Sequence, residues 1–192
     1  NCLLSCFDHC IKSKDYINVI IASKHPRTQW LNMNDAVKHC TKGVGIWDFA
    51  SNDQNAEPDI VLACCGDTPT IEVVATSEII RSSFPNVKVR VVNVVDLVKF
   101  SNLNKDEFKK LFTKKPNLFV FHGYPNLIHE IIYDKTTNMK VIGYMENGSI
   151  TTPFDMRVRN KIDRFNICLI VASMLKNIDT KSAILAPYNS MI

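Results

Sequence analysis

Glycine is scarce in this chain, with 6 residues in 192, and long hydrophobic runs are missing. The sequence contains neither the G-x-G-x-x-G fingerprint of dinucleotide-binding folds nor the G-x-x-x-x-G-K-[ST] phosphate loop. No stretch approaches the roughly 20 apolar residues that a transmembrane helix needs. Neither sign of charge dominates, because 23 Lys and Arg face 19 Asp and Glu, a formal net charge of +4. We therefore expect no membrane span and no nucleic-acid partner.

Cysteine is plentiful, but its pattern is not that of a disulfide framework or a zinc site. The seven cysteines are odd in number and irregularly spaced, and no secretory signal precedes them, which predicts reduced thiols in a cytoplasmic protein. Cys2, Cys6 and Cys10 lie four residues apart and share one face of an expected helix over residues 1–13. A zinc site needs a second ligand pair, which the sequence does not supply. We expect these thiols to pack, and no metal to bind.

Apolar β-rich runs alternate with helical patterns along the whole chain. This alternation predicts an α/β three-layer sandwich, with a mostly parallel, mixed sheet between helices on both faces. The strand order stays open. The expected strands are residues 17–23, 44–50, 59–65, 87–95, 117–122 and 140–145, and the expected helices are 34–40, 69–85, 106–112, 126–133 and one long helix over 153–175.

The clearest βαβ unit runs from residue 59 to residue 95. Gly66 and Asp67 form its first turn, Thr68 is the expected N-cap, and Pro69 falls at the first helical position. Exposed N–H groups at this helix start suit an anion, although the Asp67 carboxylate opposes one. A regulatory domain that binds an effector here is one alternative function.

A second alternative is an independent hydrolase or transferase of α/β fold. Cys64 and Cys65 end one expected strand and His122 ends another, so a Cys65–His122 nucleophile pair is conceivable. No acidic residue is fixed to orient the histidine, and both thiols follow a buried run, which favours packing roles. His122 and Tyr124 flank Gly123 and are candidates for lining a cleft.

The segment K-H-P-R-T-Q-W at residues 24–30 carries cationic and polar side chains directly after an apolar run. Lys and Arg at the carboxyl end of a strand suit an anionic ligand such as a sugar phosphate. A solvated loop packed over Trp30 explains the segment equally well. Lys24, His25 and Gln29 are its candidate ligand-facing residues.

Several of these segments together resemble one known family. The runs INVIIASKHPRTQW, EPDIVLACCGDTPTIEVVATSEIIR, VKVRVVNVVDL, FHGYPNLIHEIIY and TTPFDMRVRNKIDRFN are similar to the C-terminal domain of xylulose-5-phosphate/fructose-6-phosphate phosphoketolase, one of the transketolase-like thiamine-diphosphate enzymes. They occur in the family's order and cover nearly the whole chain.

The resemblance implies a parent enzyme that cleaves xylulose 5-phosphate or fructose 6-phosphate with phosphate, giving acetyl phosphate and an aldose phosphate. It implies a homodimer or higher oligomer, with thiamine diphosphate and Mg²⁺ held by N-terminal domains. Residues 1–13 would then end a preceding segment, and residues 14–192 would form one structural and interface domain that is inactive alone.

The resemblance also assigns roles to individual residues. It implies no catalytic residue, no cofactor ligand and no metal ligand in this domain, because Gly66-Asp67-Thr68 departs from the Gly-Asp-Gly motif that captures the diphosphate and Mg²⁺. It associates Lys24 with the substrate's phosphate.

Overall fold

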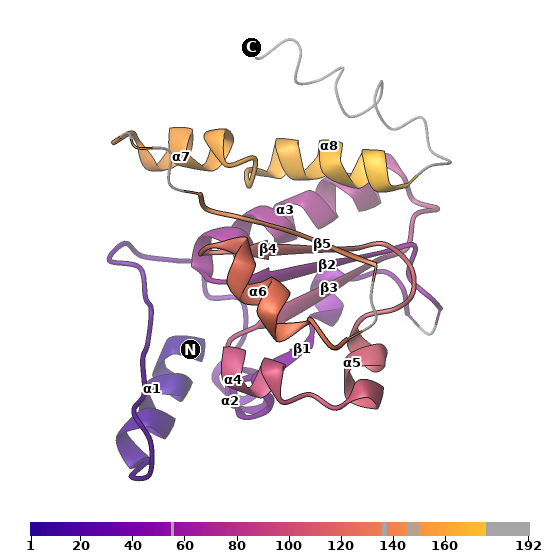
Figure 1. The fold of residues 1–192 in the computed structure, drawn as a ribbon. Coiled ribbons are helices and arrows are strands. Elements are labelled where there is room, and N and C mark those ends of the chain that lie inside the picture. The colour runs from indigo at the N-terminus through magenta and orange to yellow at the C-terminus, as the bar shows by residue number, and fades with distance from the viewer. Residues whose placement is uncertain (55, 136–137, 146–147, 149, 176–192) are drawn as a thin grey trace.

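The computed structural model describes residues 1–54, 56–135, 138–145, 148 and 150–175, and its centre is a five-stranded mixed sheet (Figure 1). The spatial order is β1-β3-β2-β4-β5, in which β1 is antiparallel to β3 and the other neighbours are parallel. The strands are β1 (Val44–Ile46), β2 (Ile60–Cys65), β3 (Val89–Val94), β4 (Asn117–Phe121) and β5 (Met139–Gly143). The expected mixed, mostly parallel sheet is therefore confirmed.

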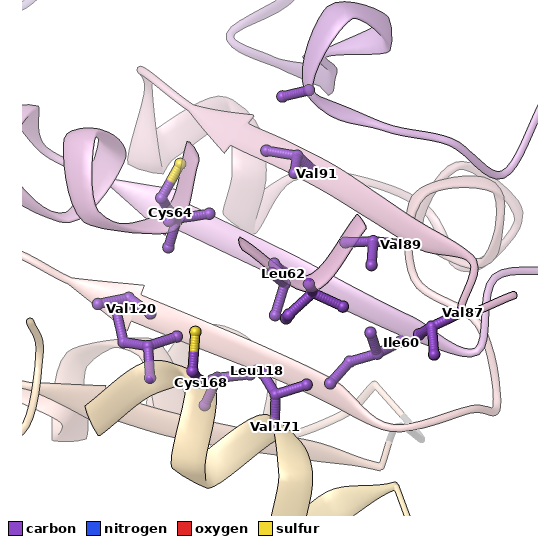
Figure 2. Packing of buried hydrophobic residues seen from close by; sticks show 14 of the residues in the cluster. Ile60, Leu62, Cys64, Val87, Val89, Val91, Leu118, Val120, Cys168 and Val171 are labelled. Atoms are coloured by element: carbon purple, nitrogen blue, oxygen red, sulfur yellow. The ribbon is translucent and has the colours of Figure 1, made fainter. Parts of the chain in front are cut away.

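Helices cover both faces of this sheet, as the sequence predicts. One face packs against α3 (Asp67–Ser83) and α8 (Arg164–Met174), and Figure 2 shows Leu62 and Leu118 in its core near Val171. The opposite face is rich in phenylalanine, including Phe100 and Phe119. The helices on that second face are α4 (Leu97–Ser101), α5 (Lys105–Leu111) and α6 (Pro125–Ile131). Strands buried on both faces explain the near-continuous apolar runs of β2 and β4.

Two further helices lie near β1. Helix α2 (Met33–Lys42) is capped at its start by Asn32, whose side chain accepts a hydrogen bond from the Asp35 N–H. Gly43, in the left-handed conformation (φ 79°), caps its end. A short 3-10 helix, η1 (Asp48–Ala50), follows β1 where the sequence suggested a longer strand. Helix α1 (Cys2–Lys12) packs on α2 and stands apart from the sheet (Figure 1).

The prediction of a buried strand over residues 17–23 is wrong. This segment has no strand pairing in the structure, and Ile17, Val19 and Ile21 are 92%, 82% and 88% exposed. Its β-rich composition is real, but a strand needs a neighbour that accepts its hydrogen bonds. The described part of the chain supplies none.

Two helix boundaries also differ from the sequence prediction. The expected single helix over 153–175 is two helices, α7 (Pro153–Arg159) and α8, because Lys161 adopts a positive φ of 56° and Asp163 caps a new helix. Helix α3 starts before Thr68, with Gly66 as its N-cap. Pro69 still fits, since the first turn of a helix needs no donated N–H.

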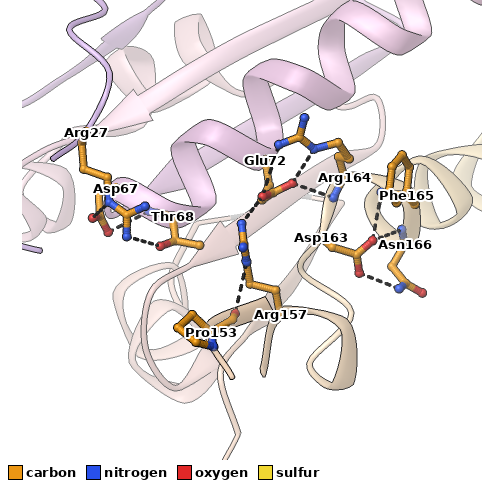
Figure 3. A network of polar contacts seen from close by, with 10 residues as sticks. All are labelled: Arg27, Asp67, Thr68, Glu72, Pro153, Arg157, Asp163, Arg164, Phe165 and Asn166. Atoms are coloured by element: carbon orange, nitrogen blue, oxygen red, sulfur yellow. Dashed lines mark hydrogen bonds and ion pairs between the residues drawn. The ribbon is translucent and has the colours of Figure 1, made fainter. Parts of the chain in front are cut away.

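A buried carboxylate joins helix α3 to the C-terminal helices. Glu72 is 2% exposed, and its oxygens accept hydrogen bonds from Arg157 Nη1 at 2.7 Å, Arg164 Nε at 2.9 Å and the Arg164 backbone N–H at 3.0 Å (Figure 3). Each carboxylate oxygen thus accepts a hydrogen bond from a guanidinium group, and Oε2 also accepts one from the Arg164 backbone N–H. Such charge-assisted contacts are stronger than neutral hydrogen bonds.

We expect Glu72→Gln to lower the free energy of unfolding by about 1.5–3 kcal/mol, because the amide keeps the shape but loses the charge that both guanidinium groups face. Urea unfolding measures this difference. Glu78→Gln is the matched control on the same helix, since the Glu78 side chain that pairs with Arg81 is 67% exposed; this change should alter stability by no more than about 0.5 kcal/mol. Equal effects of the two changes would contradict the assigned role of Glu72.

A polar chain lies inside the domain between α2, β3 and α3. His39 Nε2 lies 2.8 Å from Asn93 Oδ1, and Asn93 Nδ2 donates to Thr70 Oγ1 at 3.1 Å. Burial lowers the pKa of His39 below its ordinary value of 6.5, although the hydrogen bond to Asn93 partly opposes this shift. The folded state therefore favours the neutral imidazole.

The depressed pKa of His39 makes stability depend on pH. Above pH 6.5 the imidazole is neutral in both states; below it the unfolded chain takes up a proton that the folded chain resists. Stability should therefore fall as the pH drops through 6.5 toward the lower folded pKa. Urea unfolding between pH 5 and pH 8 (roughly the histidine range) should show a flatter profile for His39→Gln. His129→Gln, at an exposed position, should keep the slope of the parent protein.

Candidate functional site

The carboxyl ends of β2 and β4 meet at the point where the chain's crossovers diverge. From β2 the chain passes through α3 to β3, whereas from β4 it passes through α6 to β5 on the opposite side. In open α/β sheets, this divergence leaves a crevice between the two strand ends where ligands commonly bind. Asp67 follows β2 and His122 follows β4, so both residues lie at the point where the crossovers diverge.

Asp67 is the centre of a polar group that we call the Asp67 cluster, comprising Arg27, Asp67, Thr68, His122 and Tyr144. The Asp67 carboxylate accepts hydrogen bonds from Arg27 Nε at 2.6 Å and from the Thr68 N–H at 2.7 Å, and it lies 3.1 Å from His122 Nδ1. Partial burial raises the pKa of Asp67, but the hydrogen bonds from Thr68 and Arg27 outweigh it, so the pKa is lowered overall. The cluster therefore holds a stable carboxylate.

Gly66 makes the close approach of β2 and β4 possible at this edge. Its φ is 100°, and a Cβ built there would collide with the Cβ of His122. On the far side, the ring of Tyr144 lies 4.9 Å from that of His122, and its hydroxyl hydrogen-bonds the Thr68 side chain. Burial raises the pKa of Tyr144, while the nearby Arg157 partly opposes the shift. The phenol thus stays protonated near neutral pH.

Arg27 connects the Asp67 cluster to the segment that carries Lys24. Besides its bond to Asp67, its Nη2 donates to Thr68 Oγ1 at 3.3 Å (Figure 3). Lys24, His25 and Gln29 flank Arg27 on an exposed stretch outside the sheet. The Arg27 side chain therefore ties this part of the segment to the sheet edge, while Trp30 at its end packs against Trp47 and Phe49.

The other residues singled out from the sequence lie near this edge in different ways. His122 enters the Asp67 cluster, whereas Tyr124 is the N-cap residue of α6 and is 55% exposed. Gln29 Oε1 accepts a hydrogen bond from the Asn1 amino group at 2.6 Å. Among these candidates, the structure brings His122 alone into the described contacts of Asp67.

The structure does not favour a Cys65 nucleophile. Cys65 packs among the apolar side chains of the phenylalanine-rich face. Burial raises the pKa of its thiol to about 12, and the neighbouring Cys64 adds to that rise. A thiol in this environment stays protonated near neutral pH and is a weak nucleophile. The His122 ring faces Asp67 instead.

The helix start at Thr68 is also a poor place for an anionic effector. The Asp67 carboxylate already accepts the Thr68 N–H, and Arg27 covers the Thr68 hydroxyl. A shallow depression of about 680 Å³ lies elsewhere, along α2 and β1, and does not include the Asp67 cluster.

Two further findings concern metal binding and membrane insertion by the described residues. No three His, Cys, Asp or Glu side chains within that part of the chain are grouped to hold a metal ion. No helix there has both the length and the apolar character needed to cross a membrane.

Solved structures show which fold class this arrangement defines. Transketolase from Leishmania mexicana superposes with a TM-score of 0.57 at 10% identity, covering 74% of this chain and 19% of that one. Transketolase from Pichia stipitis in complex with sedoheptulose-7-phosphate gives a TM-score of 0.55 at 13% identity, covering 73% and 19%. The domain is thus an α/β domain of the transketolase fold class.

Sequence comparison then gives the family. The model described as the XFP C-terminal domain matches residues 24–190, and the chain belongs to that family. It is 50% identical to "Probable phosphoketolase 1" of Rhizobium meliloti, over 95% of this chain and 24% of that protein. It is 52% identical to "Probable phosphoketolase" of Gloeobacter violaceus, over 87% of this chain and 22% of that protein. The chain therefore spans about a quarter of the length of these relatives.

Sequence reasoning missed four of the five members of the Asp67 cluster as site residues, because it singled out His122 but not Arg27, Asp67, Thr68 or Tyr144. It treated Asp67 as an obstacle to anions and Thr68 as a cap, and it did not consider Tyr144. The position of Asp67 directly after the strand–glycine junction was an available signal. The ion pair between Arg27 and Asp67 could not be predicted from the sequence, because it joins residues 40 positions apart.

We expect Asp67→Asn to release the segment over residues 24–30, because the amide no longer pairs with the Arg27 guanidinium. Hydrogen exchange of that segment should speed up, while global stability falls by no more than about 1 kcal/mol, as is usual for a partly exposed ion pair. Arg27→Gln should reproduce the effect. Asp134→Asn, at an exposed carboxylate, is the control, and unchanged exchange in both cluster variants would refute the anchoring role.

Proposed function

We propose that this chain is the C-terminal structural and interface domain of a phosphoketolase. The parent enzyme would cleave xylulose 5-phosphate or fructose 6-phosphate with phosphate to acetyl phosphate and an aldose phosphate. The family match and the relatives named phosphoketolase at about 50% identity support this proposal. The single observation that carries it is the match over residues 24–190.

The exposed apolar surface near the start of the chain supports an interface role. Side chains there stand out from α1 and from the segment after it, in a way that is unfavourable in water and typical of a surface that another domain covers. We propose that the N-terminal thiamine-binding domains of the same enzyme cover it, and that the enzyme is a homodimer or higher oligomer. The residues are Leu3, Leu4, Phe7, Ile11, Tyr16, Ile17, Val19 and Ile21.

The described residues do not fit thiamine diphosphate or its Mg²⁺. The one Gly-Asp pair at a strand end is Gly66-Asp67, and its carboxylate is already committed to Arg27 and Thr68. Magnesium sites use free carboxylate and carbonyl oxygens together with the phosphate groups they bind. We therefore assign the cofactor to the N-terminal domains and no cofactor ligand to this chain.

Lys24 is our candidate for contact with the phosphate of the ketose substrate. Its side chain is exposed, and within the described residues no carboxylate pairs with it. It lies three residues before Arg27, which is held at the carboxyl edge of the sheet by Asp67. A free ammonium near a fixed backbone point suits a phosphate dianion. His25, Gln29, His122 and Tyr124 are proposed to line the same cleft.

In the full-length enzyme we expect Lys24→Ala to raise KM for the ketose phosphate about tenfold to hundredfold. A charge-assisted hydrogen bond contributes roughly 1.5–3 kcal/mol, and about 1.4 kcal/mol corresponds to a factor of ten. Thiamine affinity and thermal stability should barely change, because the side chain is exposed and lies outside the core. Steady-state kinetics over a range of ketose phosphate concentrations measure the effect.

Lys14→Ala is the matched control, since Lys14 is another exposed lysine ten residues earlier in the chain. It should leave kcat/KM unchanged. A kcat/KM within about twofold of the parent enzyme for Lys24→Ala would rule out the phosphate contact, because a lost interaction of even about 1 kcal/mol has a larger effect.

A further inference from the structure

Three cysteine side chains meet where α1 packs on α2. Cys2 and Cys6 lie one helical turn apart on α1, and the Cys40 side chain of α2 is close enough to shift the pKa of both thiols. The Cys40 Sγ also lies 3.6 Å from the Cys2 carbonyl oxygen. Cys2 and Cys6 are partly exposed, so a small solute can reach them, whereas Cys40 is buried. We call this group the thiol cluster.

The surroundings of the thiol cluster favour a reactive sulfur. Hydrogen bonds from Cys40 lower the pKa of Cys2 and of Cys6 to about 7, against partial burial that raises it. The charges facing Cys6 from outside the helix pair are Asp96, which raises its pKa, and Lys99, which lowers it. The pKa of Cys40 is raised, mainly by the hydrogen bonds it makes to its two neighbours. Cys2 and Cys6 are thus the more easily ionised thiols of the cluster, and Cys40 is the less easily ionised one.

We propose that Cys2, Cys6 and Cys40 form a peroxide-sensitive site in which oxidation joins Cys40 to α1 by one disulfide bond. An α1 thiolate attacks a peroxide oxygen, the O–O bond breaks, and the sulfur becomes a sulfenic acid while hydroxide leaves and takes up a proton. The Cys40 thiol then condenses with the sulfenic acid: an S–S bond forms, the S–O bond breaks, and the thiol proton leaves with the hydroxyl group as a second water. In sum, two thiols and one hydrogen peroxide give one disulfide and two waters.

The third thiol of the cluster gives this site a route for rearrangement. After oxidation, one of Cys2 and Cys6 is bonded to Cys40, and the other remains a free thiol beside the new disulfide. By thiol–disulfide exchange, this free thiol can attack the disulfide and replace the first α1 sulfur in the bond to Cys40. In both forms the bond joins α1 to α2. Because α1 otherwise stands apart from the sheet, the oxidised chain would hold its first helix far more firmly to the sheet domain.

The test uses the full polypeptide that carries this chain, treated with hydrogen peroxide, alkylated and digested with trypsin without reduction. Trypsin separates the cysteines of the two helices. The peptide ending at Lys12 carries all three α1 thiols, and residues 39–42 form a separate peptide with Cys40. We expect a disulfide-linked pair of these two peptides in mass spectra, which disappears after reduction.

Single changes then identify the sulfurs. Cys40→Ser should abolish the linked pair, Cys2→Ser and Cys6→Ser should each keep it, and Cys10→Ser, one turn further along α1, should leave it unchanged. If Cys40→Ser fails to fold, the double change Cys2→Ser with Cys6→Ser should abolish the link without touching α2. Over-oxidation to sulfinic acid without a linked pair, a link that survives these changes, or a link between two copies would overturn the proposal.

Discussion

The ion pairs of the Glu72 carboxylate are the interaction on which the docking of α7 and α8 depends. The carboxylate is buried on α3, yet its partners come from α7 and α8, more than 80 residues later in the chain. A buried charge costs several kcal/mol unless it is paired and fully hydrogen-bonded, so α7 and α8 must dock with the two arginines in place. The break between those helices leaves the Arg164 backbone N–H free to donate to the same carboxylate.

Helix α3 thus organises both sides of the domain with two acidic residues five positions apart. Asp67, the first residue of α3, forms an ion pair with the segment that precedes α2. Glu72 forms ion pairs with the helices that follow the sheet. Asp67 also sits where the positive end of the helix dipole favours a negative charge. The geometry of the candidate site is therefore set by the same helix that completes the core.

Much of the fold could be predicted from the order of apolar and polar residues alone. The apolar runs of β2 and β4 and the capped turn after β2 predict buried parallel strands and a βαβ unit, and the structure contains both. The segment over residues 17–23 shows the limit of that reasoning, because composition reports a tendency to form a strand and not the presence of a partner. The site was less predictable: Arg27 and Asp67 meet through tertiary packing, whereas the strand-end positions of Asp67 and His122 could be read from the sequence.

The unpaired segment after α1 has a practical consequence for handling the domain by itself. Residues 17–22 read INVIIA, an uncharged run of high β-propensity without proline, and they lie in the open with their backbone groups unpaired within the described part. Segments of this kind are templates for strand addition between molecules. A domain expressed by itself would best begin after this run, near residue 23, close to the start of the family match. Alternatively, a charged residue in place of Val19 would block intermolecular strand pairing.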